Sequence, residues 1–357
     1  MVGITLLLQH GFVSPLTAFM SGGFPRRFHR RLFRSINLPA RLVHSTPLPL
    51  PLITFKTRVT TRFSAQLARC PVCPALTWLD PGLPPAQLRT MSATTSEIGS
   101  IIGIGASCFA SVYINQTVFK GYEIWVDGRR RSYTGRPCEE ALRREASVYQ
   151  QLGKHPRILD CYGLVESHPG VHSLHLELAP LGNVRQYIDD HSLPPSRTRI
   201  SMALDTAVGL AHVHARGVRH ADLSCRNLFL FNGFRVKIGD FGASVVEGSN
   251  FTPEVCEEAR YELPCRSRSF DDWPMINREL FALGSSVYEI VAWERPFPSL
   301  KEEEVEERYA REEFPSLDII SAVRPTITNC WKEVYKTADD AVASLDEVLA
   351  VLPEEDG

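Results

Sequence analysis

The chain has 357 residues and a formal net charge of −2, with 44% hydrophobic and 22% charged residues. This length is ample for one large or two smaller units with buried cores. No apolar run approaches the roughly 18 residues that a membrane-spanning helix needs, so we expect no transmembrane segment. Nine cysteines, odd in number and scattered, favour reduced thiols inside a cell over a disulfide framework.

Charge is distributed unevenly along the chain. Residues 1–90 hold eleven of the 39 basic residues but only one of the 41 acidic residues, Asp80. The remainder therefore has 28 basic and 40 acidic residues, a net charge of −12, which argues against nucleic acid as a partner.

Residues 1–95 are expected to form a disordered or transit-like basic leader. They are rich in proline and arginine, poor in acids, and without sustained periodicity. A basic amphipathic segment over residues 24–34 is compatible with mitochondrial import, whereas a true start at Met91 would make the leader an artefact. We therefore expect an intracellular protein, cytoplasmic unless the leader is a genuine transit peptide.

The folded part begins with two β-prone runs between residues 97 and 112, joined by a turn of small residues. Gly103 and Gly105 lie at this turn, where glycine allows backbone N–H groups to approach phosphates closely. A short strand over residues 117–120 follows and ends at Lys120.

Residues 138–152 are predicted to form an amphipathic helix. Apolar residues recur on one face at spacings of three and four, namely Leu142, Ala146, Tyr149 and Leu152. Glu145 lies on that same face and needs a partner, because an unpaired buried charge is costly. The nearest candidate upstream is Lys120. Arg143 and Arg144 are expected on the outer, solvated face.

Two strands, over residues 158–166 and 171–178, and several helices follow. The helix expected over residues 199–216 is apolar on most sides, as is typical of a helix buried within a larger lobe, and Gly217 is a natural stop after it. A second strongly apolar helix is predicted over residues 278–293, and a closing helix over residues 338–352.

A hairpin is predicted between these helices. Leu228 to Phe231 and Phe234 to Ile238 are β-prone, and Asn232-Gly233 between them is typical of a two-residue type I′ turn.

Polar clusters flank this hairpin on both sides. Because a hairpin returns the chain to its start, Asp222, Asn227 and Asp240 are expected to converge at its open end. Two carboxylates and an amide oxygen suit a hard cation such as Mg²⁺ that also binds phosphate oxygens. Phosphoryl transfer then needs one carboxylate to orient the attacking hydroxyl and accept its proton.

The first cluster reads HADLSCRN from His220 to Asn227, and the second reads DFG from Asp240 to Gly242. They resemble the H-R-D-L-x-x-x-N and D-F-G patterns of the protein kinase family, except that Ala221 stands in place of arginine. The resemblance covers residues 96–353. It implies an α+β, bilobal protein kinase fold, with a β-rich N-lobe (96–178) and a mostly α-helical C-lobe (181–353).

The resemblance also implies roles for individual residues. Asp222 would be the catalytic base, Asn227 and Asp240 the metal ligands, and Lys120 the contact to the ATP phosphates, held by Glu145. Arg226 matches an arginine in the tyrosine-kinase form of the catalytic loop, and would belong to the catalytic set.

A nucleotide site between the lobes is implied in the same way. Residues 101–112 are similar to the glycine-rich loop, although the third glycine is absent and about two extra residues precede the match at Val112. Residues 176–184 resemble the hinge, with Leu176 as gatekeeper. Backbone groups of Glu177 and Ala179 would bind adenine, and Asn183 would lie near the ribose.

Three positions depart from the family pattern. Cys265 replaces the glutamate of the A-P-E motif, and the arginine that usually pairs with that glutamate is also absent, near residues 337–338. Glu279 stands where kinases carry an aspartate that braces the catalytic loop. Ala221 replaces an arginine that binds an activation-loop phosphate in many kinases, so we expect activity that is independent of loop phosphorylation.

The expected activity is ATP- and Mg²⁺-dependent transfer of a γ-phosphoryl group to protein hydroxyls. Serine or threonine is favoured over tyrosine, because residues 260–265 do not follow a tyrosine-kinase pattern. A pseudokinase acting as a nucleotide-binding scaffold remains an alternative, suggested by the departures above. A small-molecule phosphotransferase is another, since sugar and aminoglycoside kinases share an H-x-D-x-x-x-x-N loop. The oligomeric state is left open.

Overall fold

A computed structural model describes most of the chain beyond residue 100. The described residues are 101–104, 108–113, 117–126, 129–132, 136–168, 170–251, 257–268, 274–318 and 320–353. All of them belong to one compact unit. The expected leader over residues 1–95, Met91 and Gly105 lie outside the described residues.

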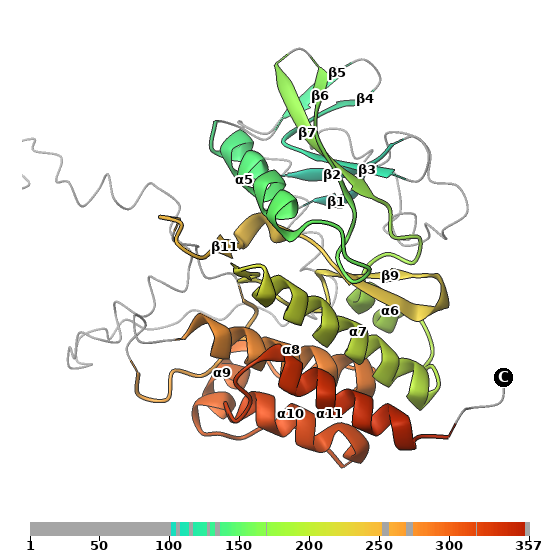
Figure 1. Cartoon of the computed structure of the whole chain (residues 1–357), viewed down its shortest axis with the longest axis vertical. Coiled ribbons are helices and arrows are strands. Elements are labelled where there is room, and N and C mark those ends of the chain that lie inside the picture. Colours follow the sequence, from blue (N-terminus) through green and yellow to red (C-terminus); the bar gives the residue numbers. More distant parts are fainter. Residues whose placement is uncertain are drawn as a thin grey trace, which may run out of the picture. The chain divides into compact units, whose positions relative to one another are not determined.

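The N-lobe is built on an antiparallel sheet of five strands in the order β1-β2-β3-β7-β6 (Figure 1). The strands are β1 (Ile101–Ile104), β2 (Phe109–Tyr113), β3 (Thr117–Gly121), β6 (Cys161–His168) and β7 (Val171–Glu177). Val112 pairs with Val118, which pairs with Leu176, so three buried side chains form one apolar row across the sheet. A separate two-stranded ribbon joins β4 (Glu123–Val126) and β5 (Arg129–Ser132).

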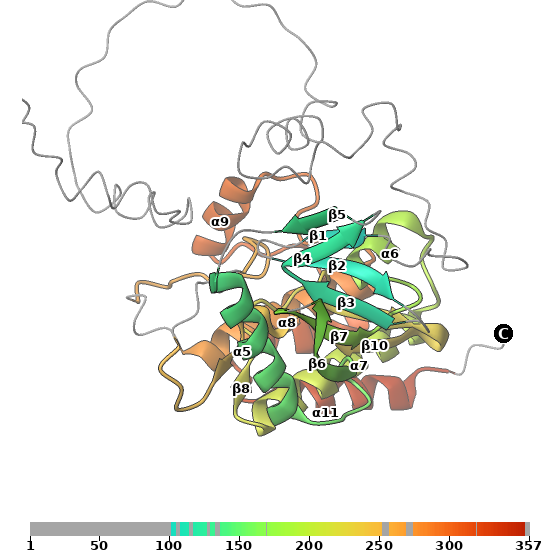
Figure 2. The same ribbon diagram turned by 90° about the horizontal axis from the view of Figure 1, so that it is seen from above.

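Helix α5 (Arg136–Leu152) packs against this sheet, as Figures 1 and 2 show. The predicted apolar face is buried: Leu142, Ala146, Tyr149 and Leu152 are between 1% and 7% exposed. Arg143 lies on the outer face, as expected, where it pairs with Glu139. The expectation was wrong for Arg144, whose Nη2 donates to the carbonyl of Gly242 at 3.1 Å and whose guanidinium lies 3.8 Å from the Phe251 ring centre. A segment distant in sequence covers that side of the helix.

The C-lobe is mostly helical, and its helices stack below the sheet in Figure 1. They are α6 (Val184–Asp190), α7 (Ser196–Ala215), α8 (Met275–Ala292), α9 (Glu302–Ala310), α10 (Arg324–Trp331) and α11 (Ala338–Val351). Helix α7 contacts α8 and α11, and its residues from Ile200 to Val213 include nine buried ones. It ends before Gly217, which has a φ of 66°. In the part of the chain that the structure describes, no helix combines the length and apolarity needed to cross a bilayer.

Two short ribbons lie between the lobes and carry the polar clusters. One pairs β9 (Leu228–Phe231) with β10 (Arg235–Ile238), and the other pairs β8 (Val218–Arg219) with β11 (Val245–Val246). Short 3₁₀ turns occur at Asn232–Phe234, Phe241–Ala243 and Ser321–Val323. The N-lobe is tied to this region because the N–H of Leu159 donates to the carbonyl of Ile238 at 2.8 Å.

The predicted hairpin is present, but its predicted turn was wrong. The connection has three residues rather than two, since Phe231 pairs directly with Arg235. Positive φ occurs at Gly233 (69°) and Phe234 (56°), not at Asn232. Phe234 packs edge-on against Tyr187, with ring centres 6.0 Å apart, and so closes the turn instead of starting the second strand.

Candidate active site

Lys120 lies at the centre of the polar cluster between the lobes. Its Nζ is 2.7 and 2.9 Å from the two carboxylate oxygens of Glu145, and 2.7 Å from Oδ1 of Asp240. Strand β3 supplies the lysine and helix α5 supplies the glutamate, which is 2% exposed. Burial favours the neutral amine, but Asp240 and Glu145 outweigh it and raise the pKa of Lys120 well above its ordinary value. The ammonium ion is therefore held between two acids.

Asp240 reaches Lys120 through an unusual backbone conformation. Its φ and ψ are 60° and 65°, in the left-handed region that residues other than glycine rarely adopt and that often marks functional sites. The Lys120 ammonium holds the pKa of Asp240 below its ordinary value. Phe241 follows, is 1% exposed, and packs with ring centres 5.0 Å from both Tyr149 of α5 and His220. This contact ties α5 to the loop that carries Asp240.

The loop from His220 is braced from α8. Glu279 accepts a hydrogen bond from the N–H of Ala221 at 2.7 Å, and its other oxygen lies 2.5 Å from Nε2 of His214. The side chain of Glu279 thus braces the loop, as its position in the sequence suggests. The partner His214 was missed by the sequence reasoning, because a histidine at helical spacing resembles an ordinary packing residue.

Asp222 and Asn227 lie together in this loop. Nδ2 of Asn227 donates to the carbonyl of Asp222 at 2.7 Å and to its Oδ2 at 3.1 Å. Oδ1 of Asp222 is buried and receives no hydrogen bond from any described residue. Burial raises the pKa of Asp222 to about 7, against the opposing charge of Arg226. The carboxylate therefore has one oxygen anchored by Asn227 and one buried oxygen without a hydrogen-bond partner among the described residues.

Asn227 also links the loop to Asp240, because its carbonyl accepts from the N–H of Gly239 at 3.0 Å. The amide nitrogen of Asn227 is used by Asp222, which leaves its Oδ1 as an acceptor. The carboxylate of Asp240 is 46% exposed. Such oxygen donors are those that Mg²⁺ takes alongside phosphate oxygens and water, so the residues present fit that ion.

Arg226 stands between two acids. Its Nη2 is 3.8 Å from Oδ1 of Asp222, and its Nε is 2.7 Å from Oε1 of Glu258. Glu258 also accepts two hydrogen bonds from Arg185 of α6, at 2.8 and 3.0 Å. Neither Arg185 nor Glu258 was singled out from the sequence, because no local pattern links α6 to residues 73 positions further on.

The predicted nucleotide-binding residues are distributed around the hinge. Gly103 lies in β1, and Val112 belongs to the apolar row that ends at Leu176. The Ala179 carbonyl accepts from Gly182, whereas its N–H has no backbone partner among the described residues.

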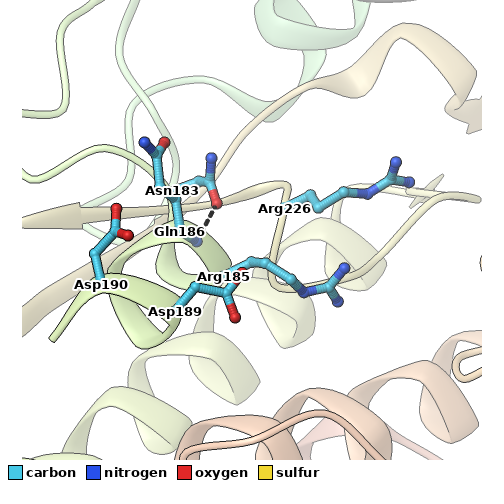
Figure 3. Close-up of a pocket in the computed structure, with 6 residues that line it drawn as sticks. All are labelled: Asn183, Arg185, Gln186, Asp189, Asp190 and Arg226. Atoms are coloured by element: carbon cyan, nitrogen blue, oxygen red, sulfur yellow. Dashed lines mark hydrogen bonds between the residues drawn. The ribbon is translucent and has the colours of Figure 1, made fainter. Parts of the chain in front are cut away.

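Two of these residues are held by contacts to the C-lobe. The side chain of Glu177 contacts Lys237 Nζ at 2.7 Å, and Oδ1 of Asn183 caps α6 by accepting from the N–H of Gln186 at 2.9 Å. Figure 3 shows the latter bond at the edge of a cavity of about 320 Å³ that Arg226 also lines. The side-chain oxygen of Asn183 is thus already hydrogen-bonded to the backbone of α6.

The A-P-E region holds a second unpredicted arrangement. After Cys265, Nε of Arg266 contacts Glu312 at 2.6 Å, and Arg268 contacts Glu333 at 2.8 Å. Arg266 also pairs with Glu333. The acids follow α9 and α10 and the bases are Arg266 and Arg268, the reverse of the family's usual order.

A lysine between two acids, a braced aspartate loop and two lobes joined at a hinge together define a kinase fold. The sequence model for the protein kinase domain matches residues 98–355, so the chain belongs to the protein kinase family.

Individual relatives match parts of the chain. Mitogen-activated protein kinase kinase kinase 20 of Arabidopsis thaliana is 38% identical over 111 residues, which is 29% of this chain and 32% of that protein. Probable serine/threonine-protein kinase kinX of Dictyostelium discoideum is 24% identical over 292 residues, 76% of this chain and 26% of that protein. Serine/threonine-protein kinase PLK4 of Xenopus laevis is 27% identical over 203 residues, 54% and 21% respectively. The matches span no more than a third of each relative.

Proposed function

We propose that this chain is an active protein kinase that transfers the γ-phosphoryl group of ATP to serine or threonine hydroxyls of proteins. The observation that carries the proposal is the pairing of Lys120 with Glu145 and Asp240, at 2.7 to 2.9 Å. Phosphoryl transfer depends on positioning and charge neutralisation more than on covalent chemistry, and this cluster supplies a fixed cation between the lobes.

In this proposal Lys120 binds the phosphates, and Glu145 fixes its ammonium group. Gly103, Gly105 and Val112 cover the nucleotide, Glu177 and Ala179 bind adenine through backbone groups, and Asn183 lies near the ribose. The N–H of Ala179, without a backbone partner among the described residues, supports the adenine contact.

Asn227 and Asp240 would hold Mg²⁺, which supplies neutralisation of phosphate charge when it is bound. The nucleotide and metal roles of these side chains are proposals that follow from the family pattern and the geometry above.

Asp222 is proposed to act as the catalytic base. Its Oδ2 is fixed by Asn227, whereas its buried Oδ1 has no hydrogen-bond partner among the described residues, so an acceptor hydroxyl that enters the site can hydrogen-bond to Oδ1. As the hydroxyl oxygen bonds to the γ-phosphorus, the bond to the ADP oxygen breaks, and the hydroxyl proton passes to Oδ1. Arg226, 3.8 Å away, offsets the negative charge of the carboxylate.

Serine and threonine are proposed as acceptors for two reasons. The printed names of the relatives from Dictyostelium and Xenopus describe serine/threonine kinases. In addition, residues 260–265 do not follow a tyrosine-kinase pattern. The proposed substrate is a class, the serine and threonine hydroxyls of proteins, and no individual protein or pathway is proposed.

An in vitro assay tests the proposal. The purified chain, with ATP and MgCl₂, is expected to phosphorylate a generic protein or itself, and mapping of the modified residues is expected to give serine or threonine. Asp222→Asn retains the side-chain shape and should lower kcat by roughly 10²- to 10⁴-fold. A chain that binds nucleotide but transfers no phosphate would instead support the pseudokinase alternative, and transfer to small hydroxylated acceptors alone would support the phosphotransferase alternative.

A further inference from the structure

Glu258 connects the activation segment, residues 243–265, to two arginines that differ in exposure. On one side Arg185 donates to both of its oxygens, at 2.8 and 3.0 Å. Arg185 is 9% exposed and is itself held by fully buried Glu289, at 2.5 and 2.9 Å, and by the hydroxyl of Tyr261 at 3.0 Å. On the other side lies Arg226, whose side chain is 50% exposed. The carboxylate is thus anchored by the buried arginine and restrains the exposed one.

The side chains of Arg185 and Arg226 extend in the same direction in Figure 3, away from Asp190. Both guanidinium groups contact Glu258 within 3.0 Å, so this carboxylate is their shared partner. Burial acts to raise the pKa of Glu258, but these two arginines keep it below its ordinary value. The carboxylate is therefore ionised at neutral pH and holds Arg226 by charge as well as by geometry.

Arg226 has a second acid within reach. Its Nη2 lies 3.8 Å from Oδ1 of Asp222, which is too long for a hydrogen bond, while its Nε makes the 2.7 Å contact with Glu258. Arginine and carboxylate favour paired, bidentate hydrogen bonds when nothing opposes them. An Arg226 released from Glu258 would close on Asp222 and occupy Oδ1, the oxygen that no described residue hydrogen-bonds.

We propose that Glu258 is a positioning residue for phosphoryl transfer, which holds Arg226 back from Asp222 and so leaves Oδ1 of Asp222 without a partner and able to accept a hydrogen bond from the acceptor hydroxyl. The inference rests on the proposed function, because it takes Asp222 as the proton acceptor. Glu258 acts only through Arg226.

The substitution Glu258→Gln tests this role, because it removes the charge and keeps the shape. We expect kcat to fall by up to about a hundredfold, as for a displaced catalytic group, with an unchanged KM for ATP. Glu258→Asp keeps the charge and should recover part of kcat. Glu312→Gln is the matched control: it breaks the 2.6 Å contact to Arg266 of the same region, has no contact with Arg226, and should leave kcat unchanged.

A double-mutant cycle separates positioning from a merely structural effect. In an Arg226→Gln background no guanidinium remains to be restrained, so Glu258→Gln should cause no further loss of kcat. An equal loss in both backgrounds would overturn the proposal, since Glu258 would then act by another route.

A crystal structure of the Glu258→Gln variant adds a readout that does not depend on activity. Arg226 hydrogen-bonded to Asp222 supports the inference, and an Arg226 that has not moved overturns it. An active wild-type chain with an unimpaired Glu258→Gln variant overturns this role alone. A wild-type chain that transfers no phosphate overturns the proposed function and this role with it.

Discussion

The lysine cluster between the lobes and the activation segment are both held by ion pairs, but they differ in their relation to the family pattern. Lys120, Glu145 and Asp240 stand where kinase motifs lead one to expect them. In the activation segment the usual A-P-E glutamate is Cys265, and the ion pairs have moved to other residues: Glu258 with Arg185 and Arg226, and Arg266 with Glu333. The residues proposed to contact ATP therefore follow the family motif, whereas the ion pairs around the activation segment are made by other residues than the motif predicts.

Lys120→Met is expected to have the largest effect on either region. It removes the cation proposed to bind the ATP phosphates and leaves buried Glu145 without its partner, so activity should fall by at least about a hundredfold. Loss of one member of a buried pair also costs roughly 3–5 kcal/mol of stability. Lys120→Arg, which keeps the charge, should retain the stability but not the activity, because the larger guanidinium would displace the phosphates from the position proposed for them. Activity assays and urea denaturation of both variants would check this, and a fully active Lys120→Met chain would refute the assignment.

Glu289→Gln tests the ion pairs around the activation segment at their most buried member, Glu289 of α8. Glu289 is 0% exposed and hydrogen-bonded to Arg185 and Tyr261, so loss of its charge should lower the free energy of unfolding by about 3 kcal/mol. Glu258→Gln removes the other acid on Arg185, at 19% exposure, and should cost less. Urea denaturation of the two variants compares them directly. Equal losses would show that burial does not set the difference.

The sequence predicts most of the lysine cluster and few of the ion pairs around the activation segment, for physical reasons. The inward face of α5 follows from a 3.6-residue period, and an acid on that face requires a cation, so the pairing of Lys120 with Glu145 was predictable. Glu279 was also predictable as a brace, because it occupies a motif position on a helix that is buried throughout.

Where the sequence-based prediction was wrong or lacking, contacts with segments distant in the sequence determine the local structure. Helical periodicity places Arg144 outside, but the chain around Gly242 and Phe251 returns to cover it. Asn232-Gly233 favours a two-residue turn, but the contact of Phe234 with Tyr187 selects a longer one. No local pattern indicates that Arg266 pairs with an acid 67 residues later.

The ion pairs of Glu333 with Arg266 and Arg268 lead to a prediction about the stability of the fold at acidic pH. Burial acts to raise its pKa, but Arg268, Asn277 and Arg266 lower it to about 2, from an ordinary value of 4.5. A carboxyl group with a lowered folded-state pKa stabilises the fold above its ordinary pKa and loses that contribution as pH falls through its folded-state value. Glu333→Gln should therefore lower Tm by roughly 2–4 °C at pH 6 and make the decline between pH 5 and 2 shallower. Parallel curves for the variant and the wild type would contradict the shift.

The smallest expected effect is that of phosphatase treatment, because the activation segment already carries its own acids. Glu257 contacts Arg278 at 2.6 Å, and Glu258 contacts Arg185 and Arg226, so carboxylates already occupy arginines of this region. Ala221 stands where many kinases have the arginine that reads a phosphate. We therefore expect activity to change by less than about twofold after phosphatase treatment, since no anchoring charge is lost. Mass spectrometry should verify that phosphate is removed, with a mock-treated sample as control. Activity that disappears on dephosphorylation would mean that Glu257 and Glu258 do not suffice to order the activation segment. The segment would then differ from the lysine cluster by its dependence on phosphorylation, and not by its sequence alone.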